Sequence, residues 1–147
     1  MLFLFYSGIM LNMKGGNNMV DSPLIIKSKE FALQIIKVCN FIKQTKKETV
    51  LTNQLTRSGT SVGANIREAF YGHGTADFIA KLQIALKECS ESEYWLELLI
   101  ESGYYDNKDI LDKCYGVFIL IAFRIWILSN CARNKFLGST MDGSLFI

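Results

Sequence analysis

The chain of 147 residues fits one domain, and half of its residues are hydrophobic, which excludes a protein that is disordered by composition. Sixteen basic residues against fourteen acidic residues give a net charge of +2, which excludes a strongly basic or strongly acidic tail. The single proline excludes proline-rich linkers and favours long helices.

The first 18 residues contain one charged residue, Lys14, and begin with the apolar stretch 1–11. This stretch is shorter than the about 20 residues of a membrane-spanning helix, and it lacks the basic start of a signal peptide. Residues 14–19 can be back-translated as AAA-GGA-GGT-AAT-AAT-ATG, which places a ribosome-binding sequence before a start codon. Two interpretations fit: residues 1–18 are a leader ahead of a true start at Met19, or they are a short, frayed extension.

Hydrophobic spacing predicts two amphipathic helices in the first half of the remaining chain. Ser22 as N-cap and Pro23 at the first helical position begin a helix that ends near Gln44, and a second begins near Thr49. The core positions of the first are Phe31, Ile35, Val38 and Ile42, flanked by Ala32, Ile36 and Cys39. Those of the second are Leu51, Leu55, Ser58, Val62, Ile66 and Ala69.

Two glycines, Gly59 and Gly63, lie inside the second predicted helix. Each costs about 1 kcal/mol relative to alanine, which indicates that another helix approaches closely there. Residues 71–74 (YGHG) form the turn that ends this helix.

The third predicted helix has the clearest period. Thr75 is the expected N-cap and Gly103 the expected stop. Its core positions are Phe78, Leu82, Ala85, Cys89, Ser92, Leu96 and Leu99.

The fourth helix is expected from about Asn107 through the apolar segment 115–128. Arg124 argues against a membrane span, and a helix that is apolar on nearly all sides is expected to be buried in its own bundle or against partner subunits. We therefore predict an all-α fold, an antiparallel up-down-up-down four-helix bundle over residues 19–130, with a loose tail at residues 131–147.

The residues that carry catalysis or bind metals are sparse. The four cysteines form no Cys-x-x-Cys pair, and His73, the one histidine, lies in a glycine-flanked turn. The glutamates at 88, 91, 93 and 97 are not followed by the histidines that a di-iron bundle needs. We expect no catalytic, metal or cofactor site and no small-molecule substrate, so the protein is predicted not to be an enzyme, and free thiols fit a cytoplasmic location.

Charge is divided between the predicted helices. Residues 22–48 hold six lysines and two glutamates, a net of +4, whereas residues 76–101 hold six acids and two lysines, a net of −4. Two interpretations fit: solvated faces paired within one bundle, or a basic face that meets the acidic face of a neighbouring subunit in a head-to-tail ring.

A polar row also follows the second predicted helix at helical spacing: Arg57, Ser61, Asn65 and Glu68. It is either a hydrogen-bond network that fixes helix register or part of a ligand-binding surface.

Three segments in order resemble the bacterial family of 23S rRNA intervening-sequence proteins: SKEFALQI (28–35), QLTRSGTSVGANIREA (54–69) and KLQIALKECSESEYWLELL (81–99). The resemblance implies a small cytosolic four-helix bundle that is oligomeric and has no established catalysis. A related branch, the accessory variability determinant of diversity-generating retroelements, forms basic homopentameric rings that associate with a reverse transcriptase and nucleic acid.

The chain departs from that pattern in two ways. Nearly all charges vanish after Lys113, which a late frameshift or a decayed gene copy would produce, and residues 21–114 have a net charge of −1 rather than a strongly basic one. Such a chain binds RNA or DNA weakly unless its basic residues gather on one face. The candidate contacts are Lys37, Lys43, Lys46, Lys47, Arg57 and Arg67. We expect a self-assembling interaction or scaffold protein, a pentamer by resemblance, with nucleic-acid binding as the alternative.

Overall fold

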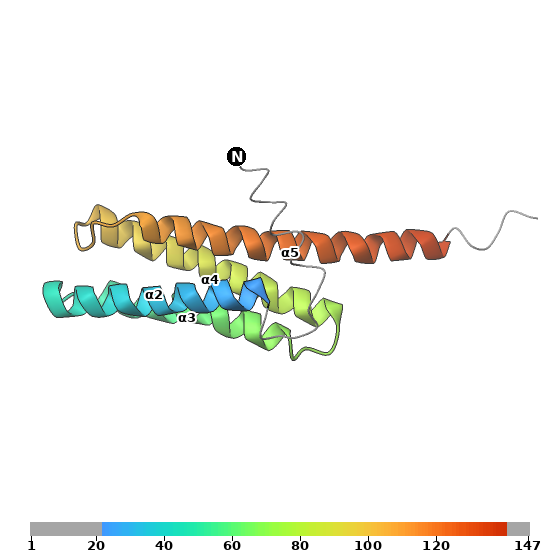
Figure 1. Cartoon of the computed structure of the whole chain (residues 1–147), viewed down its shortest axis with the longest axis horizontal. Coiled ribbons are helices and arrows are strands. Elements are labelled where there is room, and N and C mark those ends of the chain that lie inside the picture. Colours follow the sequence, from blue (N-terminus) through green and yellow to red (C-terminus); the bar gives the residue numbers. More distant parts are fainter. Residues whose placement is uncertain (1–21, 141–147) are drawn as a thin grey trace, which may run out of the picture.

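The computed structural model describes the backbone of residues 22–140 and the side chains of residues 22–131. In this part of the chain the order is α2 (Pro23–Lys46), α3 (Val50–Ala69), α4 (Thr75–Glu101) and α5 (Asp109–Thr140), without a strand (Figure 1). Successive helices run in opposite directions and are joined by short connections. The predicted all-α four-helix bundle is confirmed.

Each helix packs against two others. The most extensive packing joins α3 to α4, α2 packs against α3, and α5 packs against α4 and less extensively against α2. Within the described residues, the diagonal pairs α2–α4 and α3–α5 do not approach one another. Figure 1 also shows that α5 continues past the end of the other three helices. One side of the bundle, between α2 and α5, is therefore less tightly closed than the rest.

The core consists of the apolar stripes that the helical period predicts. In α2, Phe31, Ile35 and Ile42 are almost fully buried, whereas the flanking Ile36 lies at the surface. Leu55, Val62 and Ile66 of α3 and Leu82, Leu96 and Leu99 of α4 complete the centre. Burial of these aliphatic side chains supplies most of the stabilisation that holds the four helices together.

The close approach that the two glycines predict occurs at Gly59. A Cβ atom added there would lie 2.9 Å from both Cγ1 and Cγ2 of Ile35, whereas one added at Gly63 would lie 3.6 Å from the nearest atom, the Ser28 carbonyl oxygen. The first distance is a clash and the second is ordinary van der Waals contact. Only Gly59 is therefore required for α2 to pack against α3.

The helix ends differ in detail from the prediction. Thr75 is the first residue of α4 rather than its N-cap; the N-cap is Gly74, whose φ of 148° favours glycine. Gly103, with φ of 72°, follows the end of α4 as expected. The last helix begins at Asp109, two residues later than expected, because the Asn107 side-chain oxygen accepts a hydrogen bond from the Asp109 backbone N–H at 2.8 Å.

The N-terminus of α3 is capped by Glu48, which precedes the N-cap residue Thr49. Its carboxylate accepts hydrogen bonds from the backbone N–H groups of Leu51 at 2.8 Å and Thr52 at 3.0 Å. Partial burial raises the pKa of Glu48, but these backbone hydrogen bonds outweigh burial, so that its pKa lies below the usual value.

The sequence predicts a loose tail over residues 131–147. The described backbone of α5 is helical to Thr140, and the prediction for the tail as a whole stays a prediction. The expectations for residues 1–18 and 141–147 lie outside the described residues.

We expect Gly59→Ala to lower the free energy of unfolding by about 1–2 kcal/mol, because overpacking against Ile35 outweighs the gain in helix propensity. Gly63→Ala is the matched control and should leave stability unchanged or raise it by up to about 1 kcal/mol. Urea unfolding followed by circular dichroism measures both. Equal losses in the two variants would contradict the close approach at Gly59.

We expect Glu48→Gln to destabilise the protein by about 1 kcal/mol at about pH 7, because a neutral amide caps the helix less well than a carboxylate. The pKa of this carboxyl is lowered by folding, so its contribution is present above the unfolded pKa and is lost as the pH falls through the folded pKa. The free energies of unfolding of the two proteins should therefore converge as the pH falls below the folded pKa of Glu48, which is lower than its usual value. A difference that persisted there would contradict this role.

Candidate functional site

The polar row on α3 lies along α4, and its two ends form ion pairs across that seam. Arg57 pairs with Glu91, and Glu68 pairs with Lys81 at 2.6 Å. The hydrogen bond to Glu68 and the charge of Glu68 raise the pKa of Lys81. Both pairs are partly exposed, so each contributes little to the free energy of folding. The two pairs can form together in only one register of α3 against α4.

The middle of the row does not cross the seam. The Asn65 amide donates to the Ser61 backbone oxygen at 2.9 Å and to the Ser61 hydroxyl at 3.1 Å, both on α3. The four residues are thus two bridging ion pairs with a local contact between them, rather than one continuous network.

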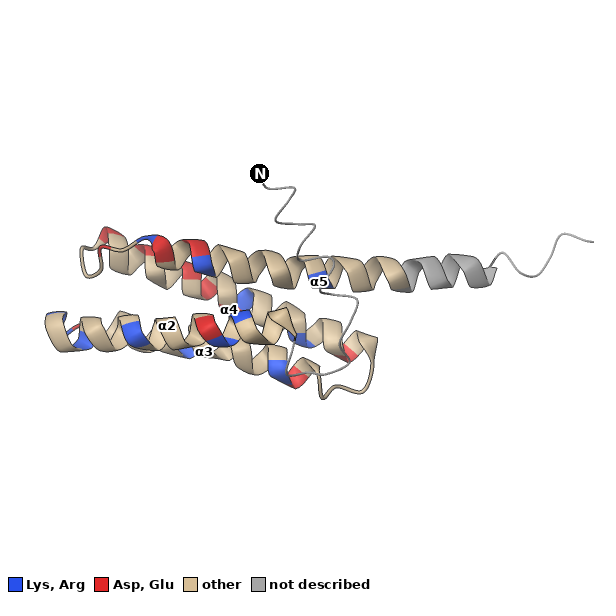
Figure 2. Cartoon of the chain, in the orientation of Figure 1, with Lys and Arg blue, Asp and Glu red and all other residues tan. Residues whose placement is uncertain are grey.

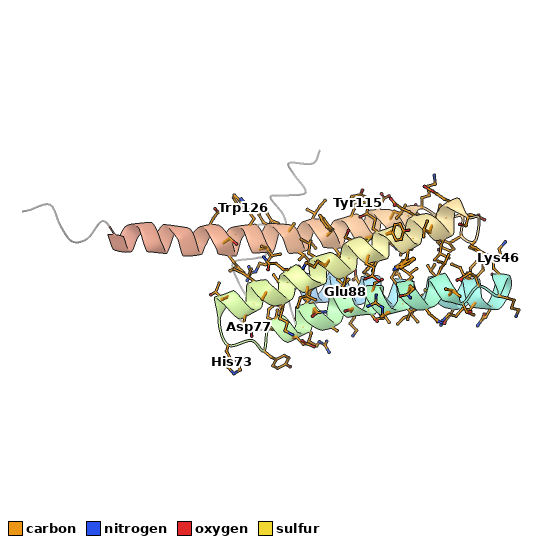
Figure 3. All side chains as sticks on the ribbon, turned by 180° about the vertical axis from the view of Figure 1, so that it is seen from behind. Lys46, His73, Asp77, Glu88, Tyr115 and Trp126 are labelled. Carbon is orange, nitrogen blue, oxygen red and sulfur yellow. The ribbon has the colours of Figure 1, made fainter. Side chains whose placement is uncertain are left out.

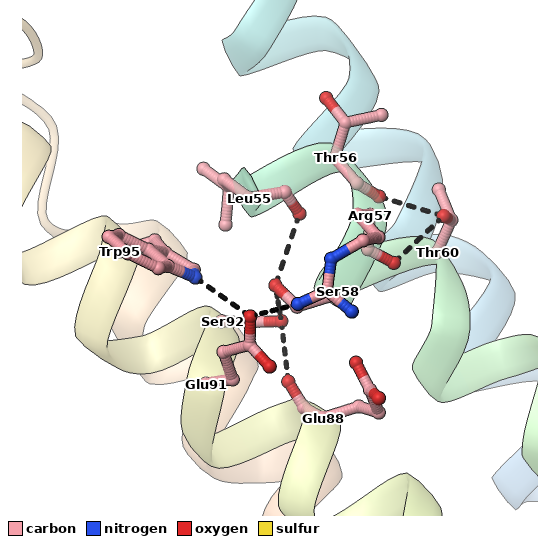
Figure 4. Close-up of polar contacts among 9 residues, drawn as sticks. All are labelled: Leu55, Thr56, Arg57, Ser58, Thr60, Glu88, Glu91, Ser92 and Trp95. Carbon is pink, nitrogen blue, oxygen red and sulfur yellow. Dashed lines mark hydrogen bonds and ion pairs between the residues drawn. The ribbon is translucent and has the colours of Figure 1, made fainter. Parts of the chain in front are cut away.

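A second group of polar contacts lies beside the Arg57 pair (Figure 4). The Ser92 hydroxyl contacts the Ser58 hydroxyl at 2.9 Å and donates to the Glu88 backbone oxygen at 2.8 Å, and both serines are fully buried. The Trp95 indole N–H donates to Glu91 at 3.1 Å. Of these contacts, the one between the two serines joins α3 to α4, and the other two lie within α4.

Glu88, which is half-buried, has one carboxylate oxygen without a hydrogen-bond partner among the described residues. Its Oε2 atom is buried and accepts no hydrogen bond among the described residues. A buried acceptor without a donor costs about 1–3 kcal/mol, so Glu88 is not expected to stabilise the seam as Glu91 does.

The six basic residues proposed for nucleic-acid contact do not gather at one place. Arg57 is engaged by Glu91, and Lys43 donates to the Asn53 side chain at 2.8 Å. Arg67 lies near the opposite end of α3 from Lys46, about 25 Å along the helix axis at 1.5 Å per residue. Lys37, Lys46 and Lys47 are exposed and form no ion pair within the described residues.

The acidic residues do gather. Figure 2 shows them concentrated where α4 ends and α5 begins, whereas α2 carries mainly basic residues. Beside this acidic region, a hydrogen bond to Glu93 and its negative charge raise the pKa of Tyr115. We call the group of Glu93, Glu97, Glu101, Asp109 and Asp112 the acidic surface, and the exposed lysines spread along the length of α2, Lys29, Lys37, Lys46 and Lys47, the basic surface.

Residues 122–131 of α5 are mostly apolar and only partly covered. Ile121 is the last buried residue of α5 within the described side chains, and Trp126 is 62% exposed. Figure 3 shows Trp126 and Tyr115 on the outer side of α5. Arg124 lies over the Phe78 ring at 6.0 Å, which attaches this part of the helix to the start of α4. The expected burial of this segment is thus not achieved within one chain.

Residues 109–131 form one helix that is long and apolar enough to cross a membrane, judged by length and composition alone. The core helix of a bundle passes the same criterion, although little of this helix is buried inside the chain. The expectation of no membrane association stays a prediction.

The described residues hold no group of three or more His, Cys, Asp and Glu side chains placed to bind a metal ion. His73 lies in the turn between α3 and α4, where its backbone N–H donates to Asp77 at 3.2 Å. Neither the sequence nor this geometry assigns a reaction to any side chain, and the absence of catalysis stays a prediction.

Sequence reasoning missed two features of the site. The Glu91 partner of Arg57 and the contact between Cys89 and Cys114 both depend on the register of neighbouring helices. Cys89 lies on the predicted core stripe of the third helix, and Cys114 lies in the predicted fourth helix. A core position does not indicate which residue of the neighbouring helix it contacts.

Comparison with known proteins gives a family match and similarity to solved structures. Residues 21–116 match the family model of the 23S rRNA-intervening sequence protein. The chain is also similar to a solved structure from Bacteroides thetaiotaomicron, described as a protein with unknown function from the S23 ribosomal protein family. The two are 45% identical with a TM-score of 0.68, over 69% of this chain and 97% of the other. No curated protein matches the chain.

We expect Glu91→Ala to lower the free energy of unfolding by about 1 kcal/mol, because Arg57 and Trp95 both lose their acceptor. Glu88→Ala makes the same chemical change on the same helix but removes an unpartnered acceptor, so it should leave stability unchanged or raise it. Chemical denaturation of both variants measures the difference. A loss for Glu88→Ala as large as that for Glu91→Ala would show that Glu88 has a partner.

Proposed function

The chain belongs to the family of 23S rRNA-intervening sequence proteins, and on that premise we propose that it is a non-catalytic bundle that assembles with copies of itself and acts as an interaction or scaffold protein. The observation that carries the proposal is the separation of charge between the basic surface on α2 and the acidic surface on α4 and α5 (Figure 2). The five-membered ring is the form that the family resemblance implies.

Within the described residues, no ion pair joins the basic surface to the acidic surface. α2 does not approach α4, which carries three of the acids, and it packs less extensively against α5, which carries Asp109 and Asp112, than α4 does. The ion pairs between helices join α3 to α4, and the one on α2 is local, between Lys27 and Glu30. Most of the charge on both surfaces thus remains available to another molecule.

The second copy is the partner that fits because each molecule carries both signs. A basic surface that meets an acidic surface at a different place makes a heterologous, head-to-tail contact, which closes into a ring when the rotation between copies allows. Complementary charge fixes the orientation and speeds encounter more than it adds affinity.

Apolar side chains supply the rest of such a contact. Leu33 is 49% exposed beside the lysines of α2, and Tyr94 is 53% exposed among the acids of α4. Exposed ion pairs contribute about 0–1 kcal/mol each, so a stable interface needs apolar area of this kind at its centre.

We expect Lys37→Glu and Glu97→Lys each to weaken self-association by about tenfold or more, since each places like charges across the contact. The double variant Lys37→Glu with Glu97→Lys should recover part of the lost affinity, because the surfaces are again opposite in sign. Light scattering over a range of protein concentrations measures the assembly.

Arg67→Glu is the matched control for Lys37→Glu, because it changes the charge equally but lies outside both surfaces. It should assemble like the unmodified protein. A molar mass of one chain for the unmodified protein at every concentration would refute self-assembly, and equal losses in control and test would refute the assigned surfaces.

Binding of RNA or DNA is the second candidate function, favoured by Lys46 and Lys47 at the end of α2, which form no ion pair within the described residues. Figure 3 shows Lys46 at this end of the bundle. Its support is weaker, because Arg57 and Lys43 are engaged inside the chain and Arg67 lies far away. Retention of RNA that falls steeply with salt and is lost in Lys37→Glu would favour this function.

A further inference from the structure

Two thiols meet in the core between α4 and α5. The Sγ atoms of Cys89 and Cys114 lie 3.6 Å apart, and the two residues are 0% and 2% exposed. They are 25 positions apart in the sequence, so no short sequence motif predicts that they are in contact. The antiparallel packing of the two helices brings them together.

The two cysteines face each other symmetrically. The Cys89 thiol lies 3.5 Å from the Cys114 backbone oxygen, and the Cys114 thiol lies 3.5 Å from the Cys89 backbone oxygen. Each sulfur thus reaches the backbone of the opposite helix, which shows that the two helices are close at this level. The sulfurs need to move together by only about 1.5 Å to reach the length of a disulfide bond.

We propose that Cys89 and Cys114 are a reversible modification site, at which a peroxide forms a disulfide that joins α4 to α5 covalently. This inference is independent of self-assembly. It needs no residue outside the pair, and the oxidant is a small molecule such as hydrogen peroxide.

The chemistry balances in two steps. One thiolate attacks the peroxide, the O–O bond breaks, and the sulfur becomes a sulfenic acid while one water forms. The second thiolate attacks the sulfenic sulfur, the S–S bond forms, and the hydroxyl leaves with a proton as a second water. The two thiols lose two electrons and two protons in total, and the peroxide is reduced to two waters.

The burial of the two thiols slows their oxidation but does not prevent it. The hydrogen bond with Cys89 and then burial raise the pKa of Cys114, so that little thiolate is present while α5 is packed. Cys131 is exposed and should react with peroxide before the buried pair does. Oxidation of the pair therefore depends on brief separation of α5 from α4.

The experiment uses the full chain with Cys131→Ser, which removes the exposed thiol. After treatment with hydrogen peroxide the protein is unfolded, its free thiols are alkylated, and it is digested with trypsin without reduction. Cys89 lies in the tryptic peptide 88–108 and Cys114 in the peptide 114–124. We expect these two peptides to be linked, with a mass lower by two hydrogen atoms, and to separate on treatment with dithiothreitol.

Cys39 is the internal control, because it is equally buried but forms no sulfur–sulfur contact within the described residues, so it should be alkylated in full. The linked protein should also unfold at a temperature several degrees higher than the reduced protein, because the bond restricts the unfolded chain. Full alkylation of Cys89 and Cys114 after oxidation, or linkage through Cys39 instead, would overturn the proposal.

Discussion

The fold depends on the lack of side-chain bulk at two adjacent positions of α3. Gly59 allows Ile35 of α2 to lie against the α3 backbone, and Ser58 meets Ser92 of α4 in a buried contact. Because protein interiors are close-packed, a larger side chain at either position would separate α3 from a neighbour and open the apolar seams on both sides. The ion pairs along α3 and α4, and through α4 the position of α5, all follow from that close packing.

Two features of the surface are not compensated by contacts within a single chain. Within the described residues, no ion pair joins the lysines of α2 to the acids of α4 and α5, and residues 122–131 of α5 are mostly apolar but only partly covered. The family match ends at residue 116, close to Lys113, where the dense charge of the chain also ends. The charged surfaces therefore lie within the matched region, whereas residues 122–131 of α5 lie beyond it.

Most of the fold follows from the sequence because the helical period of apolar residues is clear through residue 99. Phe31, Leu55 and Leu82 are predicted core residues and are buried. The ends of α4 and α5 were less predictable, since the conformation of Gly74 and the length of an apolar helix are not set by spacing. The candidate site was predicted only in part: Arg57 and Glu68 were identified as polar positions, but their partners depend on how far α4 is shifted along α3.

The attachment of α5 has a consequence for local unfolding. Because α5 packs mainly against α4 and reaches α2 less extensively, it can detach without breaking the packing of α2, α3 and α4 with one another. The other three helices follow one another with few intervening residues, so that they form a cooperative unit from contacts that are local in sequence. Amide hydrogens in the outer turns of α5 should consequently exchange with solvent at a lower opening free energy than those at the centre of α3.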